Sequence, residues 1–266
     1  MKQSVAHSSN LIQFKCTEQQ SEILSACLIG GDDANRAFNQ SITLKISGDL
    51  RLDILKQALH QLVQRNDCFR TSFDLSNNLC FIAPLHELVL STLSLSSSDQ
   101  AELVLKDLKR SFANTCFDLQ NGPLYQFHLL SQDQVHYLSL VAHHVVCDGW
   151  TLGLFINELG IQYNAQLDAS VAVQEPQRYV DFASAEASYQ TSEQFMSVKN
   201  FWTQRFKDFK PVPALPYAAG YRPSEYVYKS NHITYPLSAE QFQHLRHISD
   251  QVGCSLLVTM VSVFEV

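Results

Sequence analysis

The 266-residue sequence has no run of apolar residues near the roughly 20 that a helix needs to cross a bilayer. Residues 1–15 contain neither the apolar core nor the cleavage pattern of a signal peptide, so we interpret them as a polar lead-in. No strongly basic segment is present, and the net charge is −7. These absences predict a cytoplasmic protein that binds neither a membrane nor nucleic acid.

The sequence also lacks paired cysteines, although it contains seven of them. None of the seven belongs to a CxxC pair, which argues against a zinc site. An odd, dispersed set in apolar surroundings indicates reduced thiols. The cysteines are Cys16, Cys27, Cys68, Cys80, Cys116, Cys147 and Cys254.

Charged residues are few, at 17%, whereas hydrophobic residues make up 45%. This balance is typical of a globular chain rather than a disordered one. The length is sufficient for one large domain or for two lobes with a sizeable core. No internal repeat is visible.

Apolar spacing predicts an alternation of helices and strands. Thr17 and Ser238 each begin a capping-box pattern, and Gly30 and Gly31 interrupt the first helix. Strands are expected at 41–46, 68–73, 79–82, 124–130, 135–142 and 232–237, the fifth being apolar enough for a central strand. Helices are expected from Thr17 and at 52–64, 99–114, 150–164, 192–207 and 238–252, with a polar stretch at 91–100.

Two segments are weak in pattern. Residues 170–178 contain Pro176 and are typical of a linker between lobes, and residues 211–223 form a proline-rich loop. The last twelve residues, SLLVTMVSVFEV, predict an apolar helix that has no C-cap. We therefore expect the chain to be a fragment that was cut inside an element.

The segment 141–150, VAHHVVCDGW, joins the buried strand to a predicted helix. Because strand side chains alternate in direction, one of His143 and His144 can face a cavity while the other faces the fold. Asp148 is placed to cap the helix, and Gly149 lets the backbone approach its surroundings closely. A neutral imidazole here can accept a proton near pH 7 or donate a hydrogen bond to an oxyanion.

The residues alone leave three interpretations of these histidines open. A histidine at a strand end is more often a satisfied structural residue than a catalytic one. A metal site is the third interpretation, because His144 and Asp148 are four residues apart and would share a face if helical. The strand-like approach and Gly149 argue against a helix there.

Residues 143–149, HHVVCDG, match the HHxxxDG signature of condensation domains of non-ribosomal peptide synthetases and of related acyltransferases. Four further stretches resemble the same family in the same order: 17–20 (TEQQ), 65–73 (RNDCFRTSF, like RHxxLRTxF), 117–124 (FDLQNGPL) and 179–182 (YVDF). Asn66 and Phe69 depart from the second motif, and Gln19 departs from the opening one. The family's C-terminal motifs are absent.

The resemblance implies an α/β chain, specifically an α+β two-layer sandwich of the chloramphenicol acetyltransferase type. Residues 16–175 would form the N-terminal lobe with the HHxxxDG motif. Residues 176–266 would form a linker and the truncated beginning of a similar second lobe. In the family, the active site lies in a tunnel between the two lobes.

The implied reaction joins a carrier-bound acyl or peptidyl thioester to the amine of a carrier-bound aminoacyl thioester. The implied partners are donor and acceptor peptidyl carrier domains, with an adenylation domain downstream. No cofactor or metal would be bound directly, because the phosphopantetheine arms of the carriers bring the substrates. The short lead-in after Met1 favours the first module of a polypeptide.

The resemblance also implies roles for single residues. His144 would be the base or the transition-state stabiliser, His143 would make a structural hydrogen bond, and Gly149 would offer a backbone N–H to the oxyanion. Asp148 would be structural and pair with an arginine, with Arg70 as the first choice and Arg65 as the alternative.

Other aromatic and acidic residues are predicted to be structural. Tyr179 and Asp181 are expected to pack between lobes, and Trp150 and Trp202 are expected in the core. Two alternative functions remain open: a coenzyme A-dependent acyltransferase of the same fold, and a non-catalytic carrier-binding fragment.

Overall fold

The computed structural model describes residues 11–84, 87–96, 101–209 and 235–265. The chain divides into two compact units, Met1–Lys229 and Ser230–Val266. The expected lobe boundary after residue 175 remains a prediction.

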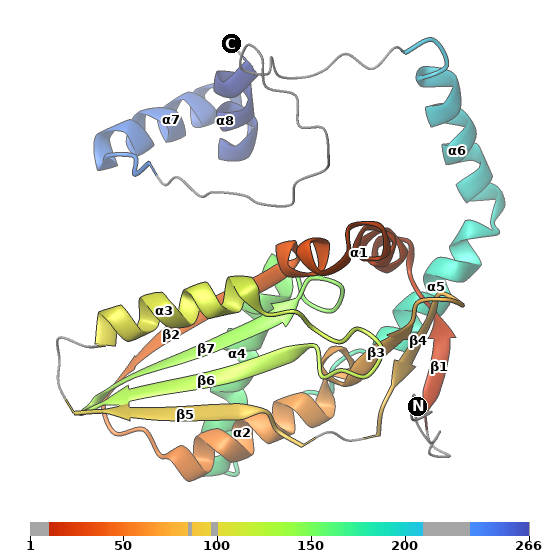
Figure 1. The fold of residues 1–266 in the computed structure, drawn as a ribbon. Helices are drawn as coiled ribbons and strands as arrows, with labels where there is room; N and C mark the ends of the chain where they lie inside the picture. The colour runs from red at the N-terminus through yellow and green to blue at the C-terminus, as the bar shows by residue number, and fades with distance from the viewer. Residues whose placement is uncertain (1–10, 85–86, 97–100, 210–234, 266) are drawn as a thin grey trace. The chain divides into compact units, whose positions relative to one another are not determined.

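A four-stranded sheet forms the centre of the first unit (Figure 1). Its order is β2 (Asn39–Ser47), β7 (Val135–His143), β6 (Tyr125–Gln132) and β5 (Leu90–Leu95). The first three strands are antiparallel, and β5 runs parallel to β6. The interior position of β7 confirms the prediction made from its apolar sequence.

Strand β5 was not predicted, because its sequence LSTLSL lies mainly in the polar stretch 91–100. It is one of the two edge strands of the sheet, and four of its six residues are exposed. An edge strand can carry polar side chains without destabilising the sheet, because only part of its surface packs against the core.

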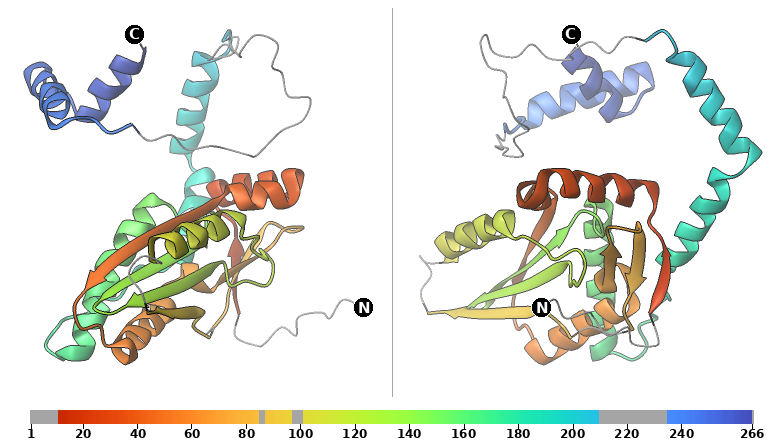
Figure 2. Two further views of the ribbon diagram at one scale, coloured as in Figure 1. Left: turned by 60° about the vertical axis from the view of Figure 1, so that its left-hand side comes forward. Right: turned by 45° about the vertical axis from the view of Figure 1, so that its right-hand side comes forward.

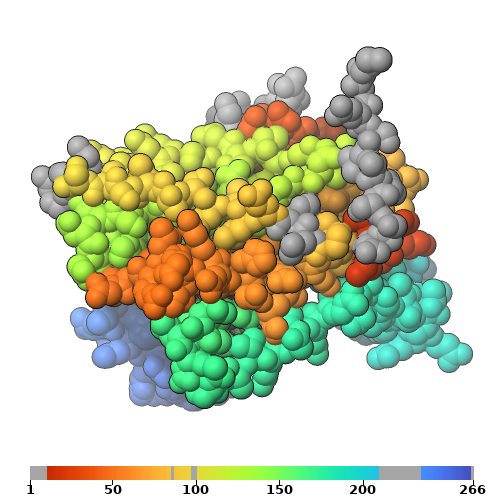
Figure 3. Space-filling view, turned by 90° about the horizontal axis from the view of Figure 1, so that it is seen from below, coloured from red at the N-terminus to blue at the C-terminus, as the bar shows by residue number. Residues whose placement is uncertain are grey.

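Helices cover both faces of this sheet (Figures 1 and 2). Helices α1 (Glu18–Ala37) and α3 (Ala101–Asn114) lie on one face, and α2 (Leu52–Arg65) and α4 (Gly149–Leu167) lie on the other. Figure 3 shows α2 and α4 side by side. The mixed α/β class is therefore confirmed.

The expected two layers are corrected to three. Leu138 and Leu140 of β7 pack with α2 and α4, whereas Val141 of the same strand packs in a separate cluster with Leu24 of α1 and Phe112 of α3. Because β7 is apolar on both faces, each face needs its own layer of helices.

A second, antiparallel sheet has the order β1 (Ile12–Lys15), β4 (Leu79–Ile82) and β3 (Thr71–Asp74). A short 3-10 helix, η1 (Asp67–Arg70), precedes β3. The predicted strand 68–73 therefore begins only at residue 71.

Local sequence signals place the helix ends. The Thr17 side chain accepts from the Gln20 N–H, and the Gln20 side chain accepts from the Thr17 N–H, which confirms the capping box of α1. Gly31 has φ 59° and ψ −144°, and the helix resumes after it. The predicted interruption is thus a kink that only glycine adopts readily.

Two helices follow the linker: α5 (Tyr179–Gln190), which was not predicted, and α6 (Glu193–Arg205), which lies within its predicted range. The Tyr179 hydroxyl lies 3.2 Å from Thr17 Oγ1, so α5 packs on the start of α1. Asp181 is exposed in this unit, and its expected packing between lobes stays a prediction.

Both tryptophans were predicted to lie in the core, and this prediction is wrong. Trp150 is 79% exposed and Trp202 is 50% exposed. Helix α4 directs Leu152, Phe155 and Leu159 into the core, and Trp150 in its first turn lies on another side.

The second unit contains α7 (Ala239–Val252) and α8 (Leu256–Glu265). The predicted capping box of Ser238 is confirmed, and Gly253 ends α7 in the left-handed conformation, with φ 70°. Residues 235–237 are not in a strand, contrary to prediction. Residues 232–234 and the proline-rich loop 211–223 lie outside the described residues.

Among the described helices, no single one is long and apolar enough to cross a membrane. Helices α7 and α8 together are long and apolar enough for a membrane span, but the pair is bent by 106°.

Candidate active site

The two motif histidines stand where β7 ends and a short loop leads into α4. The His143 N–H donates to the Leu124 carbonyl over 3.0 Å, and the His144 N–H donates to the Phe38 carbonyl over 2.7 Å. His143 is fully buried, whereas His144 is half-buried. The buried His143 ring therefore faces the fold, as predicted for one of the pair, whereas the cavity expected at the other ring stays a prediction.

The His143 ring sits inside the protein and is held on both nitrogens. Its Nδ1 accepts from the Val145 N–H over 3.2 Å, so in the neutral ring the proton is on Nε2. Nε2 lies 3.8 Å from Cys27 Sγ. Burial, with a smaller contribution from His144, lowers the pKa of His143 to about 4. His143 is therefore neutral near pH 7.

The His144 ring has the opposite arrangement. Its Nδ1 lies 2.8 Å from the backbone carbonyl oxygen of Cys147. A carbonyl oxygen can only accept, so Nδ1 of the neutral ring carries the proton and Nε2 has a free lone pair. No group in the described part of the chain hydrogen-bonds to Nε2. The loop thus presents a proton acceptor.

Asp148 is the N-cap of α4. Its carboxylate accepts from the Thr151 N–H over 2.7 Å and from the Thr151 hydroxyl over 2.6 Å. These hydrogen bonds, with a smaller contribution from His144, hold the pKa of Asp148 below its usual value. The predicted capping role is confirmed.

The predicted pairing of Asp148 with an arginine is wrong within the described residues. Arg70 pairs with Asp67 over 2.8 Å, and Arg65 pairs with Glu175 over 2.9 Å. Each arginine meets a carboxylate of its own neighbourhood, while Asp148 is exposed and directed at the first turn of α4.

Gly149 is the first residue of α4. A Cβ atom added to it would meet no described heavy atom within 4 Å. Packing within this chain therefore does not require a glycine here. The N–H of a first helical residue has no partner inside the helix, and it carries part of the positive end of the helix dipole.

The family model of the condensation domain matches residues 30–266. This chain belongs to the condensation domain family. It is 29% identical to the chondramide synthase of Chondromyces crocatus over 243 residues, which are 88% of this chain and 6% of that protein. It is 28% identical to a linear gramicidin synthase of Brevibacillus parabrevis, over 86% of this chain and 5% of that protein.

Solved condensation domains share the fold. The starter condensation domain of rhizomide synthetase has a TM-score of 0.68 at 19% identity, covering 75% of this chain and 49% of that one. The first condensation domain of the calcium-dependent antibiotic synthetase, with a substrate analogue, has a TM-score of 0.66 at 20% identity, covering 76% and 49%. The chain thus spans about half the length of these condensation domains.

Several residues that hold the condensation motif were not singled out from the sequence. The Gln20 side chain donates to the Val145 carbonyl over 3.4 Å. Asn35 bonds both backbone groups of Phe117, whose ring meets the His143 ring edge-on at 6.3 Å. The capping-box pattern indicated a local role for Gln20 at the start of α1. It did not indicate that the side-chain nitrogen of Gln20 would donate to the Val145 carbonyl.

Two of the four other matched stretches therefore meet the histidine segment of this condensation domain chain. The opening motif supplies Gln20, and the FDLxxGPL-like stretch supplies the ring of Phe117 and the carbonyl of Leu124. All three contact the segment that carries the histidine pair. Family motifs far apart in the sequence thus converge on the HHxxxDG loop.

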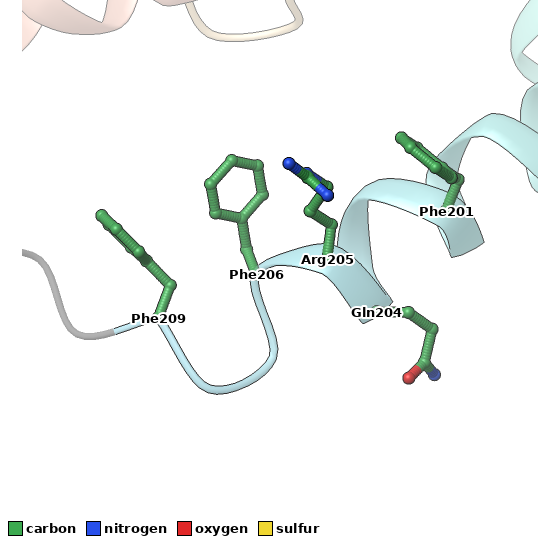
Figure 4. A pocket seen from close by; sticks show the side chains of 5 residues that line it. All are labelled: Phe201, Gln204, Arg205, Phe206 and Phe209. Carbon is green, nitrogen blue, oxygen red and sulfur yellow. The ribbon is translucent and has the colours of Figure 1, made fainter.

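Two other features lie apart from the motif. No group of three or more His, Cys, Asp or Glu residues that could hold a metal occurs in the described ranges. A shallow pocket at the end of α6 is lined by Phe201, Gln204, Arg205, Phe206 and Phe209 (Figure 4). Its three phenylalanines lie on one side with Arg205, and Gln204 points away. No motif residue lines it.

Proposed function

We propose that this chain supplies the catalytic base of a condensation domain, which forms amide bonds in non-ribosomal peptide synthesis. The observation that supports this most is the hydrogen bond from His144 Nδ1 to the Cys147 carbonyl, which leaves Nε2 as an acceptor. The donor is an acyl or peptidyl thioester, and the acceptor is an aminoacyl thioester. Each is held on the phosphopantetheine arm of a peptidyl carrier domain.

The reaction needs one proton transfer that His144 can perform. The amine nitrogen of the acceptor attacks the thioester carbonyl carbon, the C–N bond forms, and the C–S bond breaks. Nε2 of His144 takes the proton from nitrogen and returns it to the departing sulfur. An α-amine has a pKa near ~8, so a weak base suffices. Holding the two substrates in contact can contribute ~7–11 kcal/mol.

Other residues of the motif support His144. Gly149 offers its N–H, and space around its Cα, to the oxyanion that forms on the thioester carbonyl. Asp148 fixes the start of α4, and His143 anchors the strand end as a neutral structural ring. Arg70 and Arg65 act at a distance from the reaction by holding η1 and the linker.

The test is the substitution His144→Ala in a polypeptide where this chain is continuous with the rest of a condensation domain. Single-turnover amide formation between two loaded carrier domains should fall ~10²–10⁴-fold, as expected when a general base is lost. Far-UV circular dichroism should stay unchanged, because His144 is only half-buried. Turnover within tenfold of the wild type contradicts the proposal.

The same assay distinguishes a condensation domain from a coenzyme A-dependent acyltransferase of the same fold. If a soluble coenzyme A thioester replaces the donor carrier without loss of rate, the chain belongs to a coenzyme A-dependent acyltransferase. We expect a strong preference for the carrier.

An adenylation domain downstream would load the acceptor carrier in the cytoplasm.

A non-catalytic, carrier-binding role is the second candidate function. Binding of a loaded carrier by the 266-residue chain, without amide formation by the longer polypeptide, would support this role over catalysis.

A further inference from the structure

Two cysteines far apart in the sequence bring their sulfur atoms together beside the start of α1. Cys16 follows β1 and Cys80 lies in β4, and their Sγ atoms are 3.4 Å apart. The antiparallel register explains the contact, since Phe14 pairs with Cys80 and the Cys16 N–H donates to the Asn78 carbonyl. No other two cysteines in the described ranges are hydrogen-bonded to each other.

The two thiols differ in access and in electrostatics. Cys80 is fully buried, whereas Cys16 is half-buried and can meet a small solute. The hydrogen bond from Cys80 lowers the pKa of Cys16, and the same contact together with burial raises the pKa of Cys80. A reactive thiol next to a protected one is the arrangement of an attacking and a resolving cysteine.

We propose that Cys16 and Cys80 form a peroxide-sensitive dithiol that closes into a disulfide. The Cys16 thiolate attacks one oxygen of hydrogen peroxide, the O–O bond breaks, and a sulfenic acid forms with release of hydroxide. The Cys80 thiol then attacks the sulfenic sulfur, the S–O bond breaks, and water leaves. In total, two thiols and one peroxide become one disulfide and two molecules of water.

The surroundings connect this disulfide to the HHxxxDG loop. Cys80 Sγ lies 3.3 Å from Oε1 of Gln20, whose Nε2 donates to the Val145 carbonyl. Oxidation removes the one S–H group that Cys80 shares between Cys16 Sγ and Gln20 Oε1, and leaves Gln20 Oε1 with the Thr17 N–H as its donor. It also ties β1 to β4 immediately before the N-cap of α1. The oxidation state of the pair therefore acts on the segment that positions the motif.

The test is peptide mapping of the 266-residue chain after exposure to hydrogen peroxide and alkylation of the remaining thiols. We expect the peptides of Cys16 and Cys80 to be joined, with the loss of two hydrogens, before exposed Cys116 is modified. The melting temperature should rise by about 5–15 °C and fall back with dithiothreitol, because the bond closes a long loop.

Single substitutions test the order of the two steps. In Cys80→Ser, Cys16 should accumulate as a sulfenic acid that dimedone captures. In Cys16→Ser, Cys80 should stay reduced, and Cys116→Ser should behave like the wild type. The proposal is overturned if peroxide oxidises Cys116 first, if Cys16 joins other cysteines as readily as Cys80, or if Cys80 reacts without Cys16.

Discussion

Acid should destabilise the first unit of this chain through one residue, His143. The ring is fully buried and neutral, with a pKa of about 4 against the ordinary value of 6.5. As the pH falls below 6.5, His143 binds a proton in the unfolded chain but stays neutral in the folded chain. Stability is therefore present in full above pH 6.5, declines between pH 6.5 and 4, and changes no further through this residue below pH 4.

The size of the effect follows from the pKa difference. A difference of one pKa unit corresponds to 1.36 kcal/mol, so a shift from 6.5 to about 4 amounts to about 3 kcal/mol at pH 4. The free energy of unfolding of a typical domain is ~5–15 kcal/mol. One histidine would thus remove a large part of the stability.

The assay is urea unfolding, followed by far-UV circular dichroism, from pH 8 to pH 4. His143→Asn should be less stable than the wild type at pH 7, but its stability should fall about 3 kcal/mol less over this range. Burial also lowers the pKa of His128, which affects both proteins equally and cancels in the comparison. Equal pH slopes for His143→Asn and the wild type would refute the reasoning.

Three further predictions concern the loop and its supports. Asp148→Ala should lower stability by ~0.5–2 kcal/mol in urea unfolding, as expected for a lost N-cap, while Asp148→Asn should retain it; a loss of ~3–5 kcal/mol would indicate a broken buried ion pair instead. Gly149→Ala should keep the melting temperature but slow amide formation at least tenfold in the complete domain. The control Gly153→Ala, whose added Cβ also meets open space, should change neither the melting temperature nor the rate. Equal rates for the two variants would contradict the role of Gly149 in binding the oxyanion. Gln20→Glu should keep the capping box but lose the hydrogen bond to Val145, so hydrogen exchange of the loop should quicken without loss of α1; an unchanged loop would contradict the positioning role.

The parts of the site that the sequence predicted are local. The strand that ends at His143, the cap made by Asp148 and the helix that begins at Gly149 all lie within a few residues of one another. Hydrophobic periodicity and capping chemistry describe such short segments well, because the interactions that decide them involve neighbours in sequence.

The errors concern tertiary contacts. Asp148 was paired with Arg70 or Arg65 because of the family resemblance, yet Arg70 meets Asp67 of its own 3-10 helix and Arg65 meets Glu175 of the linker. Trp150 was placed in the core on account of its residue type, while its direction depends on how α4 sits on the sheet. Neither fact is encoded in local spacing.

Edge position and strand register explain two features of the fold that were not predicted. The leucines of β5 are separated by serine and threonine in a polar stretch, and pairing with β6 stabilises it as a strand. The capping pattern of α1 was visible, but the contact between Cys16 and Cys80 depends on the register of β1 and β4. Strand register is a property of the assembled sheet.

The most direct test of the central claim is nitrogen-15 NMR of the histidine side chains in the 266-residue chain near pH 7.5. His144→Gln and His143→Asn assign the two rings. We predict opposite tautomers for these neighbours: a protonated Nδ1 and a free Nε2 in His144, and a protonated Nε2 in His143. A protonated Nε2 in neutral His144 would contradict its assignment as the base.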